Sequence, residues 1–256
     1  MLTEQALALA IPLTFVVLSL LEAAAPGREF PQIPLWRAKG VAAVVVLMTI
    51  NALLPSLLPP DWLAAVRLVD GRRLGVIGGG VVGYLVVSLG NMLVHRACHR
   101  YDWLWRHVHQ LHHAPERVDM SGAAWTHPLE VVIMVLVFLG VVSALGLDPV
   151  AAALTGYIGA FFSMFQHLNV RTPAWLGYVI ERPESHMVHH AREVHALNYS
   201  DLPLWDMLFG TFRNPERFEG DVGFGAPASA RLGAMLLGAD VQGGRVARAA
   251  DARGAA

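Results

Sequence analysis

The sequence predicts an all-α fold, a polytopic bundle of membrane helices with a histidine-rich helical cap on one side. The 256-residue chain has a mean hydropathy of +0.46 and only 15% charged residues, whereas a soluble domain carries about 25%. All twelve histidines lie between His95 and His195. The apolar runs therefore predict membrane helices, and the gathered histidines predict one shared site.

Three apolar runs are long enough, or nearly so, to cross a hydrocarbon core of about 30 Å as helices. They cover residues 5–24, 40–58 and 74–94. Two further runs, 129–146 and 149–166, are joined by a turn of only a few residues. We therefore expect about three spans and a helical hairpin that does not fully cross the membrane.

The remaining segments predict smaller features. Pro12 and Pro55 fall inside predicted spans, where proline kinks a helix. The polar connection after the second run is expected to hold an interfacial helix around Trp62–Val69. A short amphipathic helix is expected near Ala230–Leu237. The end of the chain, Gly243–Ala256, is expected to be disordered because it is rich in Gly, Ala and Arg.

Basic residues orient the predicted helices. They gather after the first and third runs, at Arg28, Arg37, Lys39, Arg96, Arg100, Arg106 and Arg117. The positive-inside rule then places the N-terminus outside and every histidine on the cytoplasmic side. Three arginines after the second run oppose this orientation: Arg67, Arg72 and Arg73. The first run follows no positive charge, so we expect a retained span and not a cleaved signal peptide. The Arg, Ala and Gly bias indicates a bacterial source, hence a bacterial inner membrane.

Eight histidines form three motifs at helical spacing. The motifs are His95-x-x-x-His99, His109-x-x-His112-His113 and His186-x-x-His189-His190. Residues three and four apart share one face of a helix, so each motif is expected to present a cluster to one face. Eight imidazoles exceed the need of one metal ion, and imidazole suits Zn, Cu, Fe and Ni. The motifs therefore predict a site for two metal ions.

The other four histidines stand alone. His127 and His167 flank the predicted hairpin and are placed to complete the metal site. For His107 and His195 the sequence leaves two roles open, a role beside the ligands or a surface position. The single cysteine, Cys98, excludes an intrachain disulfide and argues against a thiolate metal site.

Several other classes of site lack their sequence signatures. The chain has no His-Glu-x-x-His of zincin proteases, no Glu-x-x-His of ferritin-like bundles, and no Gly-rich nucleotide loop or serine elbow. The net charge of −1 gives no indication of nucleic-acid binding. A metal transporter would need polar residues along its spans, and these spans contain few besides Asn51 and Asn91. Any redox reaction would need electrons from a partner.

Together the motifs and their flanks resemble the fatty acid hydroxylase superfamily, also called the sterol desaturase family. The resemblance covers about residues 80–215. The flanks that carry it are Leu104-Trp105-Arg106, His127-Pro128-x-Glu130, Gln166-His167-x-Asn169, Asn198-Tyr199 and Leu204-Trp205-Asp206-x-Leu208-Phe209-Gly210-Thr211-Phe212. Three departures are modest: an extra residue before His109, which makes His107 a supernumerary histidine, Ser200 in place of Gly, and Ala196 in place of Asp.

The resemblance implies an integral membrane non-haem di-iron oxidoreductase. Such an enzyme uses O2 and an external electron donor, a ferredoxin, a cytochrome b5-like protein or a reductase, to hydroxylate or desaturate a fatty acyl, sterol or other isoprenoid lipid. Cleavage of a lipid ether by the same chemistry stays an alternative. No catalytic side chain beyond the metal ligands and no organic cofactor is expected. The two iron (Fe) ions would be held by His95, His99, His109, His112, His113, His186, His189 and His190, joined by His167 and His127.

The same resemblance divides the chain into three regions. The first holds the N-terminal transmembrane helices. The second is catalytic and includes the membrane hairpin at 129–166, and the third is a partly disordered tail. Their boundaries are 1–94, 95–215 and 216–256.

Overall fold

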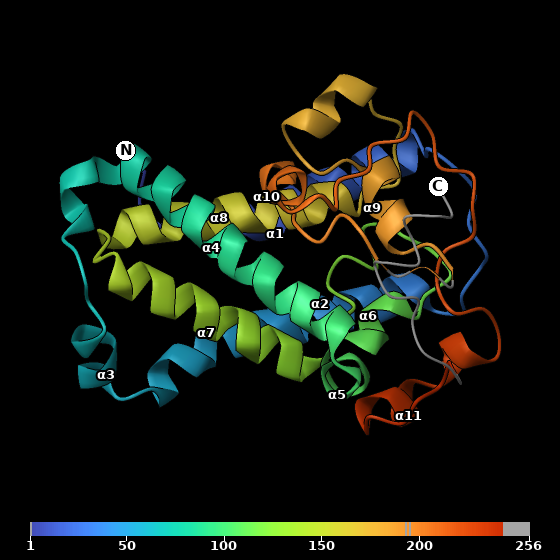
Figure 1. Ribbon diagram of the computed structural model, residues 1–256, viewed down its shortest axis with the longest axis horizontal. Helices are drawn as coiled ribbons and strands as arrows, with labels where there is room; N and C mark the ends of the chain where they lie inside the picture. The colour runs from blue at the N-terminus through green and yellow to red at the C-terminus, as the bar shows by residue number, and fades with distance from the viewer. Residues whose placement is uncertain (1, 193, 195, 243–256) are drawn as a thin grey trace.

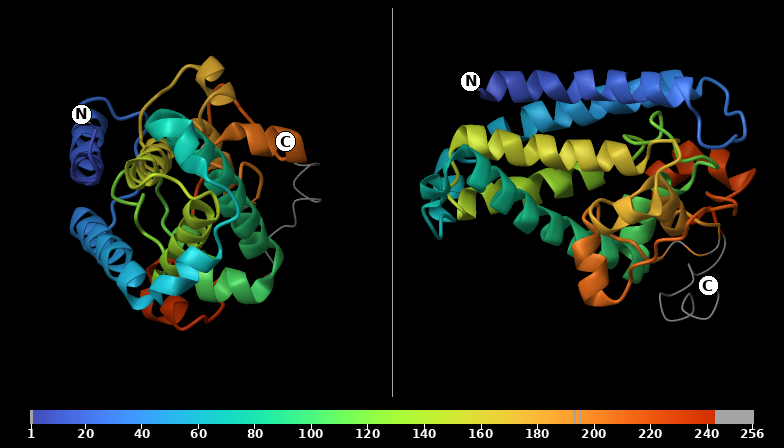
Figure 2. Two further views of the ribbon diagram at one scale, coloured as in Figure 1. Left: turned by 90° about the vertical axis from the view of Figure 1, so that its left-hand side faces the viewer. Right: turned by 90° about the horizontal axis from the view of Figure 1, so that it is seen from above.

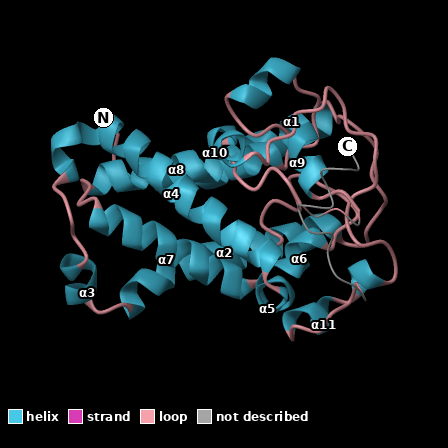
Figure 3. Cartoon of the chain, viewed as in Figure 1, coloured by secondary structure: helices cyan, strands magenta, loops and turns pink. Residues whose placement is uncertain are grey.

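A computed structural model describes residues 2–192, 194 and 196–242 of the chain. Over these residues the regular secondary structure is helical (Figure 3), with one isolated β-bridge between Ala191 and Val222. Long helices run lengthwise through one part of the molecule, and short helices and loops gather at one end of them (Figure 1). We call this end, formed by residues 101–127 and 167–242, the cap. The predicted all-α class is confirmed.

Three helices are long and apolar enough to cross a membrane by length and composition. They are α1 (Glu4–Ala24), α2 (Trp36–Leu53) and α4 (Gly75–Arg100). The α2 helix continues into the 3₁₀ turn η1 (Leu54–Leu57), and the 3₁₀ turn η2 (Gly71–Leu74) precedes α4. Each corresponds to a predicted span, and α4 extends six residues beyond the predicted end at residue 94.

The predicted hairpin is also present, as α7 (Pro128–Ala144) and α8 (Pro149–Gln166). Each helix begins with proline at its first position, where the missing N–H is not needed. The side chain of the residue before it caps the helix: His127 accepts from the Leu129 N–H and Asp148 from the Val150 N–H. Local sequence therefore fixes where both hairpin helices start.

The long helices pack in a fixed order. The α4 helix lies against both α8 and α7, α1 packs on α8, and α2 packs on α7 (Figure 2). The α4–α8 contact is close because glycines of α4 face small side chains of α8. A Cβ on Gly79 would lie 2.9 Å from Ala151 Cβ, and one on Gly83 would meet Thr155 and Leu147. The Thr155 hydroxyl donates to Gly80 O across this contact, which fixes the ends of α4 and α8 relative to each other.

One local prediction needed correction. The helix expected at Trp62–Val69 is α3 (Pro60–Ala65). It ends earlier because the chain turns back to α7, where Leu68 N and Val69 N donate to Ala144 O. Pro55 marks the change from α2 to η1. The α1 helix contains Pro12, and the kink expected there stays a prediction.

The cap consists of short helices joined by long loops. Its elements are α5 (Asp102–Leu104), η3 (Trp105–His109), α6 (Gln110–His113), η4 (Ala174–Tyr178), α9 (Pro183–His189), α10 (Pro203–Phe209), η5 (Ala228–Ala230) and α11 (Leu232–Leu236). The α11 helix lies inside the range predicted for a short amphipathic helix. The segment after Phe218 packs on the histidine motifs, since Gly223 N donates to His190 O and Phe224 N to Ala114 O. The predicted disordered end, Gly243–Ala256, lies outside the described residues, and the division into three regions stays a prediction.

Candidate metal centre

Nine histidines converge where the cap meets the end of α4, as two separate groups. In each group, one ring nitrogen of every residue lies within 4.8 Å of the corresponding atoms of the others. The first histidine group is His95, His99, His109, His113 and His189. The second histidine group is His112, His167, His186 and His190.

Each His-x-x-His-His motif is divided between the two groups. His109 and His113, four residues apart, join the first group, and His112 joins the second. The third motif is divided in the opposite sense, since His186 and His190 share the second group and His189 joins the first. The helical spacing predicted that each motif presents a cluster to one face, but it did not predict this division between two groups. Successive residues of a helix point about 100° apart, so adjacent histidines cannot face the same centre.

The first group is built from α4, η3–α6 and α9. His95 and His99 are one turn apart on α4, which extends past the predicted span, and their Nε2 atoms lie 3.2 Å apart. The Nε2 atoms of His109 and His113 lie 3.0 Å apart. His189 Nε2 is buried and has no hydrogen-bond partner, so one nitrogen of this group faces the others unpaired.

The second group is built from α6, the end of α8, and α9. His186 Nε2 lies 3.1 Å from both His167 Nε2 and His190 Nε2. His112 Nε2 lies 3.3 Å from His167 Nε2. His167 follows the last residue of α8 directly, so the hairpin contributes one residue to this group.

Hydrogen bonds at the other ring nitrogen orient five of these histidines. Their Nδ1 atoms each lie within 3.2 Å of a backbone carbonyl or carboxylate oxygen. The acceptors are Tyr199 O for His95, Glu130 Oε1 for His109, Trp125 O for His112, Ser163 O for His167 and Leu197 O for His189. An oxygen acceptor fixes the proton on Nδ1 and leaves the Nε2 lone pair for the centre of each group.

One of these acceptors is a carboxylate. Glu130 is 8% exposed in the first turn of α7, and its Oε2 accepts from the Thr126 hydroxyl at 2.6 Å while Oε1 accepts from His109 at 2.8 Å. A carboxylate behind a histidine raises the basicity of the opposite nitrogen. Glu130 lies in one of the flanks that carry the family resemblance, but no role in the site was predicted for it.

Two consecutive residues with a left-handed backbone conformation direct two of the carbonyl acceptors toward their histidines. Leu197 has φ +68° and Asn198 has φ +40°. This conformation is costly for leucine. The side chain of Asn198 stabilises it, because its amide nitrogen donates to Ser185 O and Arg213 O and its amide oxygen accepts from Arg213 N. The turn brings Leu197 O to His189 and Tyr199 O to His95.

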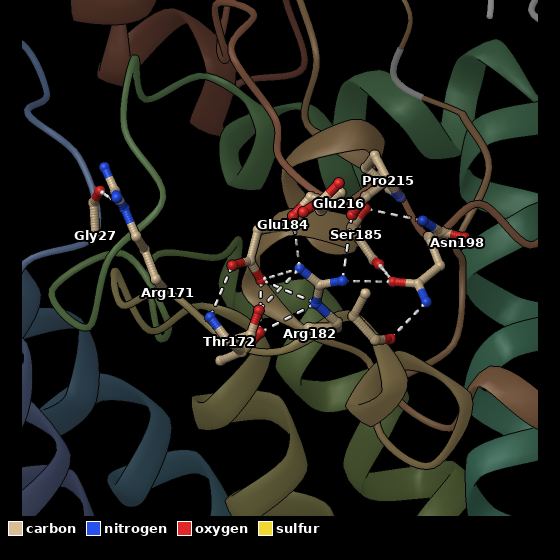
Figure 4. Close-up of polar contacts among 11 residues, drawn as sticks. Gly27, Arg171, Thr172, Arg182, Glu184, Ser185, Asn198, Pro215 and Glu216 are labelled. Carbon is tan, nitrogen blue, oxygen red and sulfur yellow. Dashed lines mark hydrogen bonds and ion pairs between the residues drawn. The ribbon is translucent and has the colours of Figure 1, made fainter.

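A buried arginine anchors the helix that carries the third motif. Arg182, fully buried before the first turn of α9, donates to Thr172, Glu184 and Asn214, and to the carbonyls of Pro215 and Glu216 (Figure 4). The Glu184 carboxylate also accepts from Thr172 N and Oγ1. One guanidinium therefore joins α9 to the segment after α8 and to the segment after α10, and no sequence motif indicated this role.

Burial keeps these imidazoles neutral. It lowers the pKa of His109 and His112 to about 3, and it holds the pKa values of His113, His186, His189 and His190 well below the usual 6.5. Neighbouring histidines lower the pKa further at most of these positions, since a charge on one opposes a charge on the next. Metal binding requires neutral imidazole, so the groups are in the correct protonation state at neutral pH.

The donor set fits bound cations. Imidazole Nε2 atoms that carry lone pairs repel one another at about 3 Å, and an unpaired buried nitrogen such as His189 Nε2 costs free energy. A cation at the centre of each group would convert both features into ligand bonds. Imidazole is a ligand for iron as well as for zinc and copper.

The remaining three histidines are His107, His127 and His195. His107 lies outside both groups: it stacks on Trp103, and its Nδ1 donates to Trp103 O. It sits in η3, a π-helical turn that holds one residue more than an α-helical turn, which accommodates the extra residue before His109. His127 also lies outside both groups, because its Nδ1 caps α7 and its Nε2 faces Leu236 O. His195 lies outside the described residues.

Comparison with known proteins identifies the family. The sequence profile of the fatty acid hydroxylase family matches residues 80–211, which is about half of the chain. The chain belongs to the fatty acid hydroxylase family. The matched range holds every residue of both histidine groups, together with Glu130 and Arg182.

Relatives within this family act on lipids. The chain is 30% identical over 142 residues to ornithine lipid hydroxylase OlsE of Rhizobium tropici, covering 54% of this chain and 42% of that protein. It is 30% identical over 142 residues to a very-long-chain aldehyde decarbonylase of Oryza sativa subsp. indica, with 51% and 53% covered. It is 25% identical over 138 residues to sphinganine C4-monooxygenase 2 of Arabidopsis thaliana, with 52% and 53% covered. The matches span about half the length of these relatives. No solved structure is significantly similar to the chain.

Proposed function

We propose that this member of the fatty acid hydroxylase family is an integral membrane di-iron enzyme that uses O2 to hydroxylate or desaturate a lipid. The single observation that carries this proposal is the pair of all-histidine groups. Five imidazoles converge in one and four in the other. Two iron ions bound there would supply the oxidising chemistry that breaks an unactivated C–H bond.

The chain's own residues prepare the site for this role. His109, His113 and His189 are at most 1% exposed, whereas His95 and His99 are half-buried. Water is therefore kept from one side of the first histidine group. The Nδ1 bonds hold the rings in place, and preorganised groups cost no reorganisation during a reaction. We infer that His95, His99, His109, His113 and His189 hold one iron ion and that His112, His167, His186 and His190 hold the other.

The site's position favours a substrate from the bilayer. His95 and His99 lie in the last turns of α4, a helix apolar enough to cross a membrane, and His167 follows the end of α8. A lipid held along these helices would have carbons within reach of the histidine groups. Orientation follows the positive-inside rule: we propose a bacterial inner membrane with both groups on the cytoplasmic side, where an external donor, a ferredoxin, a cytochrome b5-like protein or a reductase, could deliver electrons.

The first test is the metal content of the purified protein. The chain is expressed with added iron, purified in detergent, and compared with a His112→Ala/His189→Ala double variant, which removes one residue from each group. We expect about two irons per chain, lost in the double variant, because each group can complete one coordination sphere. Zinc alone, or no metal in a folded protein, would contradict the proposal.

The second test is the reaction. Membranes containing the protein are supplied with a reductant, a ferredoxin or cytochrome b5-like donor, and ¹⁸O2, and their lipids are analysed by mass spectrometry. A lipid that gains one ¹⁸O atom indicates hydroxylation, and a lipid that loses two hydrogens indicates desaturation. Ether cleavage would instead convert an ether lipid into an aldehyde, which carries the new oxygen atom, and an alcohol, which keeps the ether oxygen. No O2 uptake would contradict an oxygenase.

A further inference from the structure

The short helix α10 has the reverse of the polarity expected for a helix on a water-exposed surface. Its outward side chains are apolar: Leu204 is 42% exposed, Leu208 68% and Phe209 48%. Its inward side chain is charged, since Asp206 is 0% exposed. A helix in contact with water normally has its polar residues outside, so this pattern indicates an apolar environment.

The buried carboxylate of Asp206 is fully used within the protein. It accepts from Tyr199 N at 2.9 Å, from Ser200 N at 2.7 Å and from the Thr211 hydroxyl at 2.6 Å. The backbone of the same residue accepts from Thr211 N. The polar groups of α10 therefore bind the protein interior and leave only hydrocarbon on the outer surface.

The position of α10 relative to α4 explains the pattern. Trp205 Nε1 donates to Ser88 Oγ at 2.9 Å, and the Arg96 guanidinium lies 5.0 Å from the Phe209 ring centroid. Ser88 lies about 20 Å along the helix axis from Gly75, at 1.5 Å per residue. A hydrocarbon core of about 30 Å that begins near Gly75 extends past Ser88 to the region of His95.

The neighbouring surface is also apolar. On the face of α4 that carries Ser88, Ile77 is 63% exposed and Val81 47%, since residues seven and eleven positions apart share one face of a helix. The η4 turn packs on α10 and exposes Trp175 and Tyr178, two residue types that membranes bind at the level of the head groups. The exposed face of α10 thus continues an apolar surface that includes a candidate span.

We propose that α10 is inserted in the cytoplasmic leaflet of the bilayer, with Leu204, Leu208 and Phe209 among the lipid acyl chains. The inference rests on the membrane location in the proposed function. It adds a membrane contact that no apolar run predicted, because seven residues are far too few to span a bilayer.

The inserted helix is connected to the first histidine group. Asp206 accepts from Tyr199 N, and Tyr199 O accepts from His95 Nδ1 at 2.6 Å. The backbone N–H and the backbone carbonyl of Tyr199 thus link a lipid-facing helix to a proposed iron ligand. The bilayer therefore helps to position His95, and α10 is a positioning element of the site.

The test measures the environment of a spin label on the full-length protein in vesicles of phosphatidylethanolamine and phosphatidylglycerol. Labels are placed at Leu208→Cys, at Val81→Cys on the exposed face of α4, and at Glu219→Cys in the cap. Native Cys98 is 0% exposed and stays in place. Accessibility to O2, which partitions into lipid, is compared with accessibility to a water-soluble nickel chelate.

The expected result is that the ratio of O2 to nickel accessibility at Leu208 matches the ratio at Val81 and exceeds the ratio at Glu219. A Leu208 label that resembles Glu219, with Val81 in lipid, would overturn the inference and leave the proposed function intact. A Val81 label in water would overturn both. Loss of iron binding with Leu208 in lipid would contradict only the proposed function.

A pair of substitutions at the same position provides a second readout. Leu208→Asp places a charge on the outer face of α10, and Leu208→Ala only shortens the side chain. In a bilayer the charge displaces α10 and weakens its support of His95, so the Asp variant should lose iron that the Ala variant retains. Equal iron content and equal thermal stability of the two variants would contradict insertion, because an exposed residue in water tolerates either change.

Discussion

At the scale of single residues, the orientation of each imidazole depends on the atom behind it. Helical spacing brings histidines near one another, but the acceptors at Nδ1 determine which nitrogen faces the centre. Four of the five acceptors are carbonyls of Trp125, Ser163, Leu197 and Tyr199, which no side-chain motif encodes. The fifth, Glu130, is a side chain and can be tested by substitution.

We expect Glu130→Gln to weaken metal binding. The amide keeps the size of the carboxylate but carries no charge behind His109, and loss of such a partner typically costs about 10–100-fold in metal affinity. Iron content is measured after dialysis against a graded series of chelator concentrations. Glu219→Gln, at an exposed glutamate of the cap, is the matched control. Equal retention of iron by the two variants would show that Glu130 does not support His109.

The pKa values predict how the metal-free protein responds to acid. In the folded state burial holds the pKa of His109 and His112 at about 3, and the unfolded value is about 6.5. As pH falls below 6.5 the unfolded chain therefore takes up protons that the folded chain does not, and the free energy of unfolding decreases. The stability is fully present above about pH 6.5 and falls by about 2 kcal/mol per buried histidine by pH 5.

Thermal unfolding of the chelator-treated protein checks this at about pH 7 and about pH 5. The melting temperature should be clearly lower at the acidic pH. The iron-loaded protein should change less until the acid displaces the metal, because bound metal stabilises the folded state. A melting temperature of the metal-free protein that is constant over this range would contradict neutral, buried imidazoles.

At the scale of elements, the length of the apolar runs was sufficient to predict α1, α2, α4, α7 and α8. The short cap helices were not predictable in the same way, since no apolar period marks seven residues such as those of α9 or α10. Buried polar side chains hold these short helices in place instead. Asp206 anchors α10 and Arg182 anchors α9, and such contacts join segments that are distant in sequence.

We expect Arg182→Lys to destabilise α9 and to release iron. Lysine keeps the charge but cannot reproduce the planar fork that reaches Thr172, Asn214 and two carbonyls. Loss of several hydrogen bonds to a charged group should cost about 3 kcal/mol. Thermal unfolding in detergent and iron content are the measurements. Arg217→Lys, at an exposed arginine of the cap, should change neither, and a comparable effect there would remove the special role of Arg182.

At the scale of the whole molecule, the separation of the two histidine groups depends on how α4 crosses α8. Residues of the first group stand on α4, and His167 of the second follows α8. The sequence predicted both helices, and all nine members of the groups are among the histidines predicted as ligands. It could not predict the division into two groups. That division arises from the crossing and from the placement of α9, which contributes His189 to one group and His186 to the other.

The crossing can be tested with a pair of glycine substitutions on α4. A Cβ on Gly83 would lie 2.8 Å from Leu147 Cδ1 and would overlap the Thr155 hydroxyl, whereas one on Gly78 would have Leu74 Cβ at 3.5 Å as its nearest neighbour. Gly83→Val should therefore force α4 away from α8, at a cost of about 1–3 kcal/mol for overpacking. Because the shift moves His95 and His99 relative to the rest of the site, iron binding should fall together with stability. Gly78→Val adds the same side chain to an open face of the same helix and should leave iron binding and stability unchanged. If the two variants bind iron equally, the α4–α8 crossing does not set the geometry of the histidine groups.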